Sequence, residues 1–208
     1  MEDKNISLGK LIILDGIDGC GGETQTKKLS EFLEKKGKKV KTFSFPDYDS
    51  SIGKFLDSYL HSNDNLSPEI QTIFHYAGFL NSKKDIEQAL SEGYIIVCDR
   101  YVTTTMTYQG IQGVEYEKIE QLIKTFPIPK PDIAIYLSIS AETSAKRKMA
   151  EKGNLDRFEA DLDFLRKIAE KYTDYAKQNM YCRQEIVDAE RSIDEVSTEI
   201  AKIVNNII

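Results

Sequence analysis

The stretch Leu11-Ile12-Ile13-Leu14-Asp15-Gly16-Ile17-Asp18-Gly19-Cys20-Gly21-Gly22-Glu23-Thr24 decides the fold. Its apolar first half is typical of a buried strand, its glycines indicate a tight turn, and an amphipathic pattern over residues 24–36 predicts a helix. Gly16 and Gly21 stand at the spacing of the phosphate-binding pattern G-x-x-x-x-G-K-[ST], the Walker A loop. Such glycines let successive backbone N–H groups point inward at a helix N-terminus and form a nest for an anion. The stretch therefore predicts a strand, a phosphate loop and a helix, and a chain that binds a nucleotide.

This loop departs from the pattern at two positions that carry chemistry. Gly22 stands where the lysine belongs, and Glu23 stands where a serine or threonine would bind magnesium, although Thr24 is one residue away. Losing one preorganised group that stabilises transition-state charge typically costs roughly 3–4 kcal/mol. The loop therefore favours phosphate binding, while the same two positions put catalysis in doubt. The alternative is an ordinary tight turn, which glycines also form.

The bulk composition limits the classes of protein. The chain has 208 residues and a formal net charge of −6, which suits one α/β domain over residues 1–208 and argues against a nucleic-acid binder. Cys20, Cys98 and Cys182 are far apart and form neither zinc spacing nor a disulfide framework, so we expect a reducing cytoplasm. No apolar run is long enough to span a membrane, and the polar N-terminus lacks the core of a signal peptide.

Strand and helix patterns alternate along the chain. Alternation of this kind predicts βαβ units and a mostly parallel sheet of five strands in a single α/β domain. The expected strands are residues 10–15, 40–45, 94–99, 132–139 and 185–187. The expected helices are residues 24–36, 51–60, 68–91, 116–125, 141–151, 160–178 and 193–204. Ser67 before Pro68, and Ser192 three residues before Glu195, predict two of the helix starts.

The end of the third expected strand is a second candidate site. Asp99 and Arg100 follow an apolar run and fall at the carboxyl edge of the sheet, where α/β proteins bind ligands. Asp99 suits a magnesium ion bound through water, and Arg100 suits a bidentate clamp on a phosphate. The alternative is an ordinary surface ion pair at a strand end.

The basic segment from Lys146 to Glu159 is a third candidate. Basic residues near Gly153 suggest a mobile lid over about residues 147–158 that folds over phosphates and excludes water. The alternative is a solvated helix end, where lysine and arginine complement the helix dipole.

Taken together, these motifs resemble the thymidylate kinases. The resemblance rests on six groups of residues in the family's order: Asp15-Gly16-Ile17-Asp18-Gly19, Phe45-Pro46-Asp47, Asp99-Arg100-Tyr101 with Tyr108-Gln109-Gly110, Lys130-Pro131-Asp132, Leu155-Asp156-Arg157-Phe158-Glu159 and Val187-Asp188-Ala189. It implies a three-layer P-loop NTPase fold with a five-stranded parallel sheet, a short lid and a homodimer. It also implies transfer of the γ-phosphoryl group of ATP to dTMP with Mg²⁺, without a nucleic-acid or membrane partner.

The same resemblance implies roles for individual residues. The loop that would bind the donor nucleotide comprises Gly16, Asp18, Gly19, Cys20, Gly21, Gly22, Glu23 and Thr24. The acceptor site would comprise Asp18, Phe45, His75, Phe79, Arg100, Thr104, Thr105, Tyr108, Gln109 and Tyr172. Asp99 and Thr24 would serve the metal, and catalysis would use Arg100, Asp99, Arg147 and Lys152, with Lys148 and Arg157 as further candidates for a lid cation. Within the site, Asp18 would contact the 3′-OH or the acceptor end, Tyr108 would lie under the sugar, and Tyr172 would be a further wall.

Three acceptor positions depart from the family's pattern. His75 and Phe79 stand where the family has an aromatic residue and a base-reading arginine, and Thr105 stands where an asparagine often contacts the base. Three hypotheses therefore remain open: a thymidylate kinase, a kinase-like protein that binds nucleotide without turnover, and a kinase for a different nucleotide or nucleoside.

Overall fold

A single parallel sheet forms the centre of the molecule in the computed structural model, which describes residues 9–60, 62, 65–152 and 161–208. The strands are β1 (Lys10–Asp15), β2 (Val40–Ser44), β3 (Ile95–Asp99), β4 (Ile133–Ser138) and β5 (Gln184–Asp188). They lie in the order β2-β3-β1-β4-β5, and every pairing is parallel. The phosphate-loop strand β1 is therefore central, with Leu14 opposite Asp99 of β3.

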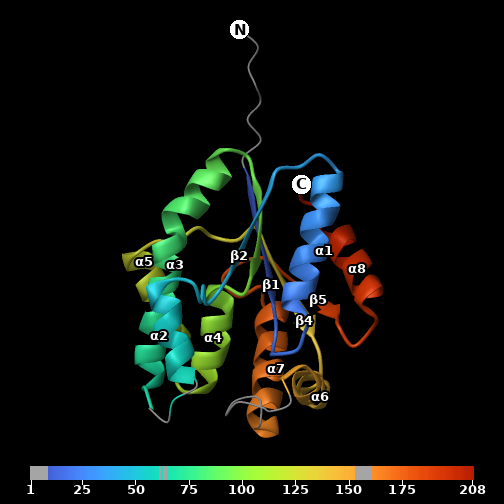
Figure 1. The fold of residues 1–208 in the computed structure, drawn as a ribbon. Helices are drawn as coiled ribbons and strands as arrows, with labels where there is room; N and C mark the ends of the chain where they lie inside the picture. The colour runs from blue at the N-terminus through green and yellow to red at the C-terminus, as the bar shows by residue number, and fades with distance from the viewer. Residues whose placement is uncertain (1–8, 61, 63–64, 153–160) are drawn as a thin grey trace.

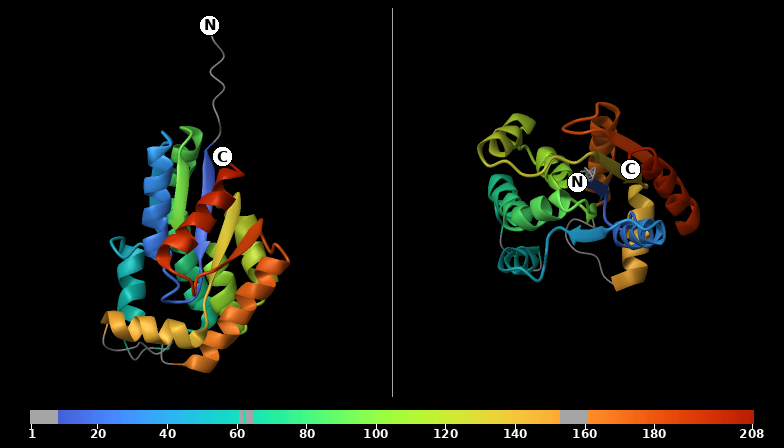
Figure 2. Two further views of the ribbon diagram at one scale, coloured as in Figure 1. Left: turned by 90° about the vertical axis from the view of Figure 1, so that its right-hand side faces the viewer. Right: turned by 90° about the horizontal axis from the view of Figure 1, so that it is seen from above.

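Helices cover both faces of this sheet (Figures 1 and 2). They are α1 (Gly22–Lys35), α2 (Ser51–Leu60), α3 (Pro68–Ser91), α4 (Val102–Ile111), α5 (Tyr116–Thr125), α6 (Ala141–Lys152), α7 (Leu162–Lys177) and α8 (Ile193–Asn205). Alternate residues of β1 point to opposite faces: Ile12 and Leu14 belong to one hydrophobic cluster, whereas Leu11 and Ile13 belong to the other. The first cluster is closed by α1, α7 and α8, and the second by α3, α4 and α5. This three-layer arrangement confirms the fold class predicted from the sequence.

Helix starts follow the local signals in the sequence. The Ser67 hydroxyl accepts from the Ile70 N–H ahead of Pro68, and Ser192 and Glu195 form a reciprocal capping box at the start of α8. Across the described residues, no helix is both long and apolar enough to cross a membrane.

One helix, α4, is absent from the sequence-based prediction, which is wrong on this point. Its first six residues are Val102, Thr103, Thr104, Thr105, Met106 and Thr107, and the β-branched ones have low helix propensity. Tertiary bonds offset this preference, because the Thr103 and Thr104 hydroxyls each donate to the Asp15 carboxylate at 2.6 Å. The helix thereby lies against the end of β1, next to the phosphate loop.

Candidate active site

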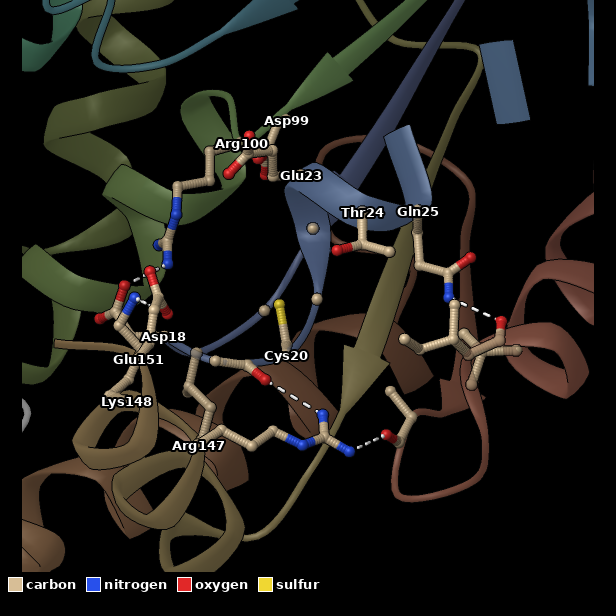
Figure 3. Close-up of a pocket in the computed structure, with 18 of the residues that line it drawn as sticks. Asp18, Cys20, Glu23, Thr24, Gln25, Asp99, Arg100, Arg147, Lys148 and Glu151 are labelled. Atoms are coloured by element: carbon tan, nitrogen blue, oxygen red, sulfur yellow. Dashed lines mark hydrogen bonds and ion pairs between the residues drawn. The ribbon is translucent and has the colours of Figure 1, made fainter. Parts of the chain in front are cut away.

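The phosphate loop follows β1 and lines a cavity of about 610 Å³ at the carboxyl edge of the sheet (Figure 3). Two of its glycines adopt left-handed backbone, Gly19 at φ +76° and Gly21 at φ +93°. Gly16 is required by space, since a Cβ there would lie 2.8 Å from the Leu137 carbonyl oxygen. The loop ends at Gly22, the first residue of α1, so the loop and the helix N-terminus line one cavity. The predicted loop residues are thus together, and this arrangement suits a polyphosphate.

Helix α6 holds this loop from the other side. The Ser144 hydroxyl donates to the Asp18 carbonyl at 2.6 Å. The Arg147 guanidinium donates to the carbonyls of Gly19 (3.1 Å) and Ala189 (2.9 Å). Arg147 therefore ties the loop to the segment after β5. Its role as a lid cation, which the family resemblance implies, stays a prediction.

Asp99 lies against Gly22, where the first side-chain atom of the missing lysine would be. A Cβ built on Gly22 would lie 2.4 Å from Asp99 Oδ1, so the carboxyl group of Asp99 lies directly against the helix start. Burial raises the pKa of Asp99 to about 6, Arg100 opposes this effect, and the charges of Asp15 and Glu23 add to it. Glu23 and Thr24 are exposed at the entrance of the same cavity. The part of the cavity next to Gly22 is therefore rich in carboxylate oxygen.

Arg100 lines both the phosphate-loop cavity, called the donor-side cavity below, and a second one, called the acceptor-side cavity. Its backbone is left-handed at φ +65°, a conformation uncommon outside glycine. Its guanidinium pairs with Asp18 Oδ1 at 2.8 Å and lies over the Tyr108 ring, whose hydroxyl donates to Asp18 Oδ2 at 3.2 Å. Asp18 and Arg100 line both cavities. An anion bound by Arg100 would lie where the two cavities meet.

The second cavity, of about 270 Å³, has an aromatic wall and polar side chains. Phe79 packs edge-on against Phe45 (4.9 Å between centroids) and is tilted on Tyr101 at the same distance. The Gln109 Oε1 atom is buried without a hydrogen-bond partner in the described residues, and Gln109 lines the cavity. Thr104, Thr105 and His75, which the sequence analysis assigns to the acceptor site, also line it. Such a wall suits a planar base, with Gln109 available to bond its edge.

The residues that line the second cavity show which face of α3 is turned toward it. His75 and Phe79 face the cavity, whereas Phe74 stacks on Phe55 of α2 at 4.2 Å. Burial and, to a smaller extent, the neighbouring charge of Arg100 lower the pKa of His75 to about 4, so the imidazole is neutral at pH 7. Phe79 offers no hydrogen bond in place of the arginine typical of the family.

Tyr172 is not part of this wall, and the prediction that it is must be corrected. Its ring stacks on Tyr136 at 4.9 Å, and its hydroxyl donates to Asp15 Oδ1 at 2.6 Å. It packs edge-on behind Tyr108, which does line the cavity. The tyrosine therefore supports the wall from the core, because its hydroxyl finds a buried carboxylate there.

Part of the predicted lid lies outside the described residues. Arg157 is among residues 153–160, and Lys152 ends α6 with a side chain that is likewise not described. Within the described part of α6, Lys148 lines the donor-side cavity and pairs with Glu151 at 2.8 Å. Cys20 also lines this cavity; burial raises the pKa of its thiol to about 12, so it remains a neutral thiol.

Sequence reasoning gave no role to several residues of the site, among them Ser144, Gln71 and Asp15. Ser144 bonds the loop, Gln71 lines the acceptor-side cavity, and Asp15 accepts hydrogen bonds from two helices. Asp15 belongs to the quoted loop motif, but nothing in that motif indicates that its carboxylate bonds other helices; Ser144 and Gln71 belong to no recognised motif, although Ser144 lies one helical turn before Arg147, on the same face. Once residues 141–151 are predicted to be a helix, this i, i+3 spacing indicates that Ser144 lies on the same face as Arg147.

Comparison with known proteins assigns this geometry to a family. The model of the thymidylate kinase family matches residues 14–200. The chain belongs to the thymidylate kinase family. It is 33% identical over 199 residues to a probable thymidylate kinase of Archaeoglobus fulgidus, covering 95% of this chain and 96% of the relative. It is 30% identical to the thymidylate kinase of Dictyostelium discoideum, covering 97% of this chain and 87% of the relative.

A solved structure gives the same result in three dimensions. The thymidylate kinase of Candida albicans, whose structure reveals the origin of broad substrate specificity in that protein, superposes with a TM-score of 0.77 at 25% identity. The alignment covers 95% of this chain and 92% of that one. Family membership and the parallel sheet confirm the resemblance drawn from the sequence. They also support a nucleoside monophosphate kinase.

Proposed function

We propose that the protein is a thymidylate kinase that transfers the γ-phosphoryl group of ATP to dTMP, giving ADP and dTDP. One observation carries this proposal: the phosphate-loop cavity and the aromatic cavity meet at Asp18 and Arg100, which line both. ATP occupies the larger cavity and dTMP the smaller one. The Arg100 guanidinium would then bind the acceptor phosphate beside the γ-phosphate.

The transfer needs positioning and charge neutralisation rather than covalent catalysis. An acceptor phosphate oxygen attacks the γ-phosphorus, the bond to the bridging β–γ oxygen breaks in line with it, and ADP leaves with that oxygen. Backbone N–H groups of the loop, from Asp18 to Thr24, bind the donor phosphates. Arg100 holds the acceptor phosphate in place of its present partner Asp18, whose carboxylate then accepts from the sugar 3′-OH.

The acceptor base fits between the aromatic residues of the smaller cavity. Phe45 and Phe79 contact its faces, Gln109 and Thr105 bond its edge, and Tyr108 lies under the sugar. The neutral His75 side chain adds one donor and one acceptor. These residues support a pyrimidine nucleotide in this cavity.

The donor-side residues also fit a magnesium ion. No group of three or more acidic, histidine or cysteine side chains is close enough to form a metal site in the described chain. Mg²⁺ at nucleotides needs only one or two carboxylates beside the phosphates, which Asp99 can supply with the Thr24 hydroxyl nearby. When bound, the ion would neutralise charge on the β- and γ-phosphates. We further propose a homodimer and a cytoplasmic location; the latter is supported by the three cysteines, which are all free thiols.

The test is an ADP-release assay with ATP, Mg²⁺ and a panel of nucleoside monophosphates. We expect turnover with dTMP, and a loss of at least about 10²-fold in Arg100→Ala, because one preorganised charge is removed from the transition state. Equal rates with dTMP, dUMP and UMP would contradict thymidylate specificity and indicate a related kinase with another acceptor.

A second candidate function is nucleotide binding without turnover, which Gly22 and Glu23 favour. The matched variant is Gly22→Lys with Glu23→Ser. Because Asp99 lies where the lysine Cβ must go, the repair needs Asp99 to move. Nucleotide binding by the native chain with no product, together with turnover by the repaired variant, would support this alternative over the kinase.

A further inference from the structure

Two helices that begin at the donor-side cavity are joined there by one buried side chain. Gln25, the fourth residue of α1, is 3% exposed, and its Nε2 atom donates to the Ile193 carbonyl at 3.0 Å. Ile193 is the first residue of α8, and both residues line the donor-side cavity. The bond therefore links the helix that begins at the phosphate loop with the helix that follows β5.

Gln25 lies at the end of this cavity that is farther from the acceptor side. Figure 3 shows Asp18 and Arg100, which line both cavities, on one side and Gln25 on the other. The γ-phosphate of the proposed donor must lie near Asp18 and Arg100 to reach the acceptor, so the donor phosphates extend from there along the loop. The nucleoside then lies at the Gln25 end, where Ile193 and Val196 offer apolar surface on one face of α8.

Protein stability alone does not account for the bond between Gln25 and Ile193. Because Ile193 begins α8, its carbonyl is also placed to accept from the backbone N–H four residues farther along the helix. The Gln25 Oε1 atom is buried without a hydrogen-bond partner in the described residues, and an apolar side chain of similar length would leave no such atom. A second link between the same helices already exists, the Lys28–Asp194 ion pair at 2.9 Å. The bond is therefore better explained by what it positions.

We propose that Gln25 is a positioning residue for the nucleoside of the phosphoryl donor. Its amide holds the start of α8 against the start of α1, which fixes Ile193 and Val196 at one distance from the phosphate loop. A donor that contacts the loop through its phosphates and α8 through its nucleoside needs both surfaces at that distance. If α8 shifts, the nucleoside loses its contacts while the phosphates keep theirs. This inference rests on the donor site proposed above.

The test compares the binding of ATP and of inorganic tripolyphosphate by calorimetry, in the presence of Mg²⁺, for the native chain and three variants. Gln25→Met has a similar length but no N–H, so it should weaken ATP binding at least about fivefold and change tripolyphosphate binding less than about twofold. Gln25→Glu should weaken ATP binding at least as much, because a carboxylate presents only acceptors to the Ile193 carbonyl. Lys28→Met is the matched control: it removes the exposed ion pair between the same helices and should change both affinities less than about twofold.

Three results would overturn the proposal. The first is a Gln25→Met protein that binds ATP as Lys28→Met does. The second is an equal loss of ATP and tripolyphosphate affinity, which indicates damage to the phosphate loop. The third is a native chain that binds tripolyphosphate as tightly as ATP, because the nucleoside then contributes nothing.

Thermal unfolding of each variant shows whether the fold is intact, and Gln25→Met should unfold close to the native temperature, since it removes the unpaired oxygen along with the bond. Binding does not require turnover. A native chain that binds ATP without phosphorylating dTMP would therefore contradict the proposed function and still decide the role of Gln25.

Discussion

At the scale of single residues, Asp99 is the group whose chemistry most directly links the site to pH. Burial raises its pKa to about 6 from an ordinary value of 3.8, so the folded protein binds this proton more tightly than the unfolded chain does. The stabilisation is therefore fully present below about pH 4 and is lost as the pH rises through about 6. The proposed function has the opposite preference, because the magnesium ion proposed at Asp99 would bind the ionised carboxylate.

This opposition gives a prediction. Asp99→Asn should stabilise the ligand-free protein at pH 8 by on the order of 2 kcal/mol and have little effect at pH 4. The same substitution should abolish the fall in Mg²⁺-dependent ATP binding that we expect of the native protein below about pH 6. Urea unfolding and ATP titrations at several pH values measure both. A native protein and variant with parallel pH profiles would show that Asp99 does not titrate in this range.

Gly22 gives a second prediction at this scale. Alanine is normally favoured over glycine in a helix, yet a methyl group here would lie 2.4 Å from Asp99 Oδ1 and 3.1 Å from its Cγ atom. Gly22→Ala should therefore destabilise the protein by about 1–3 kcal/mol, and adding Asp99→Ala should reverse most of this loss.

The control for Gly22→Ala is Gly78→Ala in α3, where a Cβ meets nothing within 4 Å. That substitution should be neutral or stabilising by about 0.5–1 kcal/mol. Equal effects of the two alanines in urea unfolding would mean that Asp99 does not lie against Gly22.

At the scale of secondary-structure elements, Asp15 joins the two halves of the site. Its carboxylate accepts from the Gly16 N–H at 2.9 Å and from the hydroxyls of Thr103, Thr104 and Tyr172 at 2.6 Å each. One buried group thus holds the phosphate loop, α4 and α7 together. Because α4 carries Tyr108 and other residues of the acceptor cavity, this carboxylate sets the position of the acceptor site relative to the loop.

Asp15→Asn should test that connection. Its amide NH₂ faces hydroxyl donors, so we expect a loss of about 2–4 kcal/mol in unfolding free energy and a KM for the acceptor raised several-fold. The matched control is Tyr172→Phe, which removes one bond while leaving α4 attached and should cost about 1 kcal/mol with KM unchanged. Equal KM values for Asp15→Asn and the native protein would argue against a positioning role.

Helix α4 marks the limit of what the sequence predicts. Strands buried on both faces and capped helices carry local signals, so Lys10–Asp15, Ser51–Leu60 and Pro68–Ser91 are predicted to the residue. Helix α4 carries none, because its helical state depends on Asp15, which lies 88 residues away from Thr103 in the sequence. In the site, motifs located the loop and Arg100, whereas the buried position of Tyr172 and the approach of α6 arise from packing alone.

At the scale of the whole molecule, half of the large, exposed apolar side chains in the described residues lie on or beside two helices. Four of the eight large, exposed apolar side chains in the described residues are Tyr48, Phe55, Ile70 and Ile73, on or beside α2 and α3. Ile73 is 59% exposed. The next residue in α3, Phe74, stacks on Phe55 of α2. A face of this kind, on helices packed against each other (Figure 1), suits an isologous contact with a second copy of the chain.

The proposed homodimer therefore predicts that Ile73→Asp produces monomers. Each interface would lose two isoleucines, one from each copy, and burial of an isoleucine contributes about 1.5–3 kcal/mol, so the dissociation constant should rise by on the order of 100-fold or more. Sedimentation velocity over a concentration series measures this. Ile186→Asp is the matched control, since Ile186 is exposed on the edge strand β5, at the other side of the sheet from β2, and its substitution should leave the dimer intact. A native chain that sediments as a monomer at all concentrations, or equal dissociation by both variants, would argue against a dimer through α2 and α3.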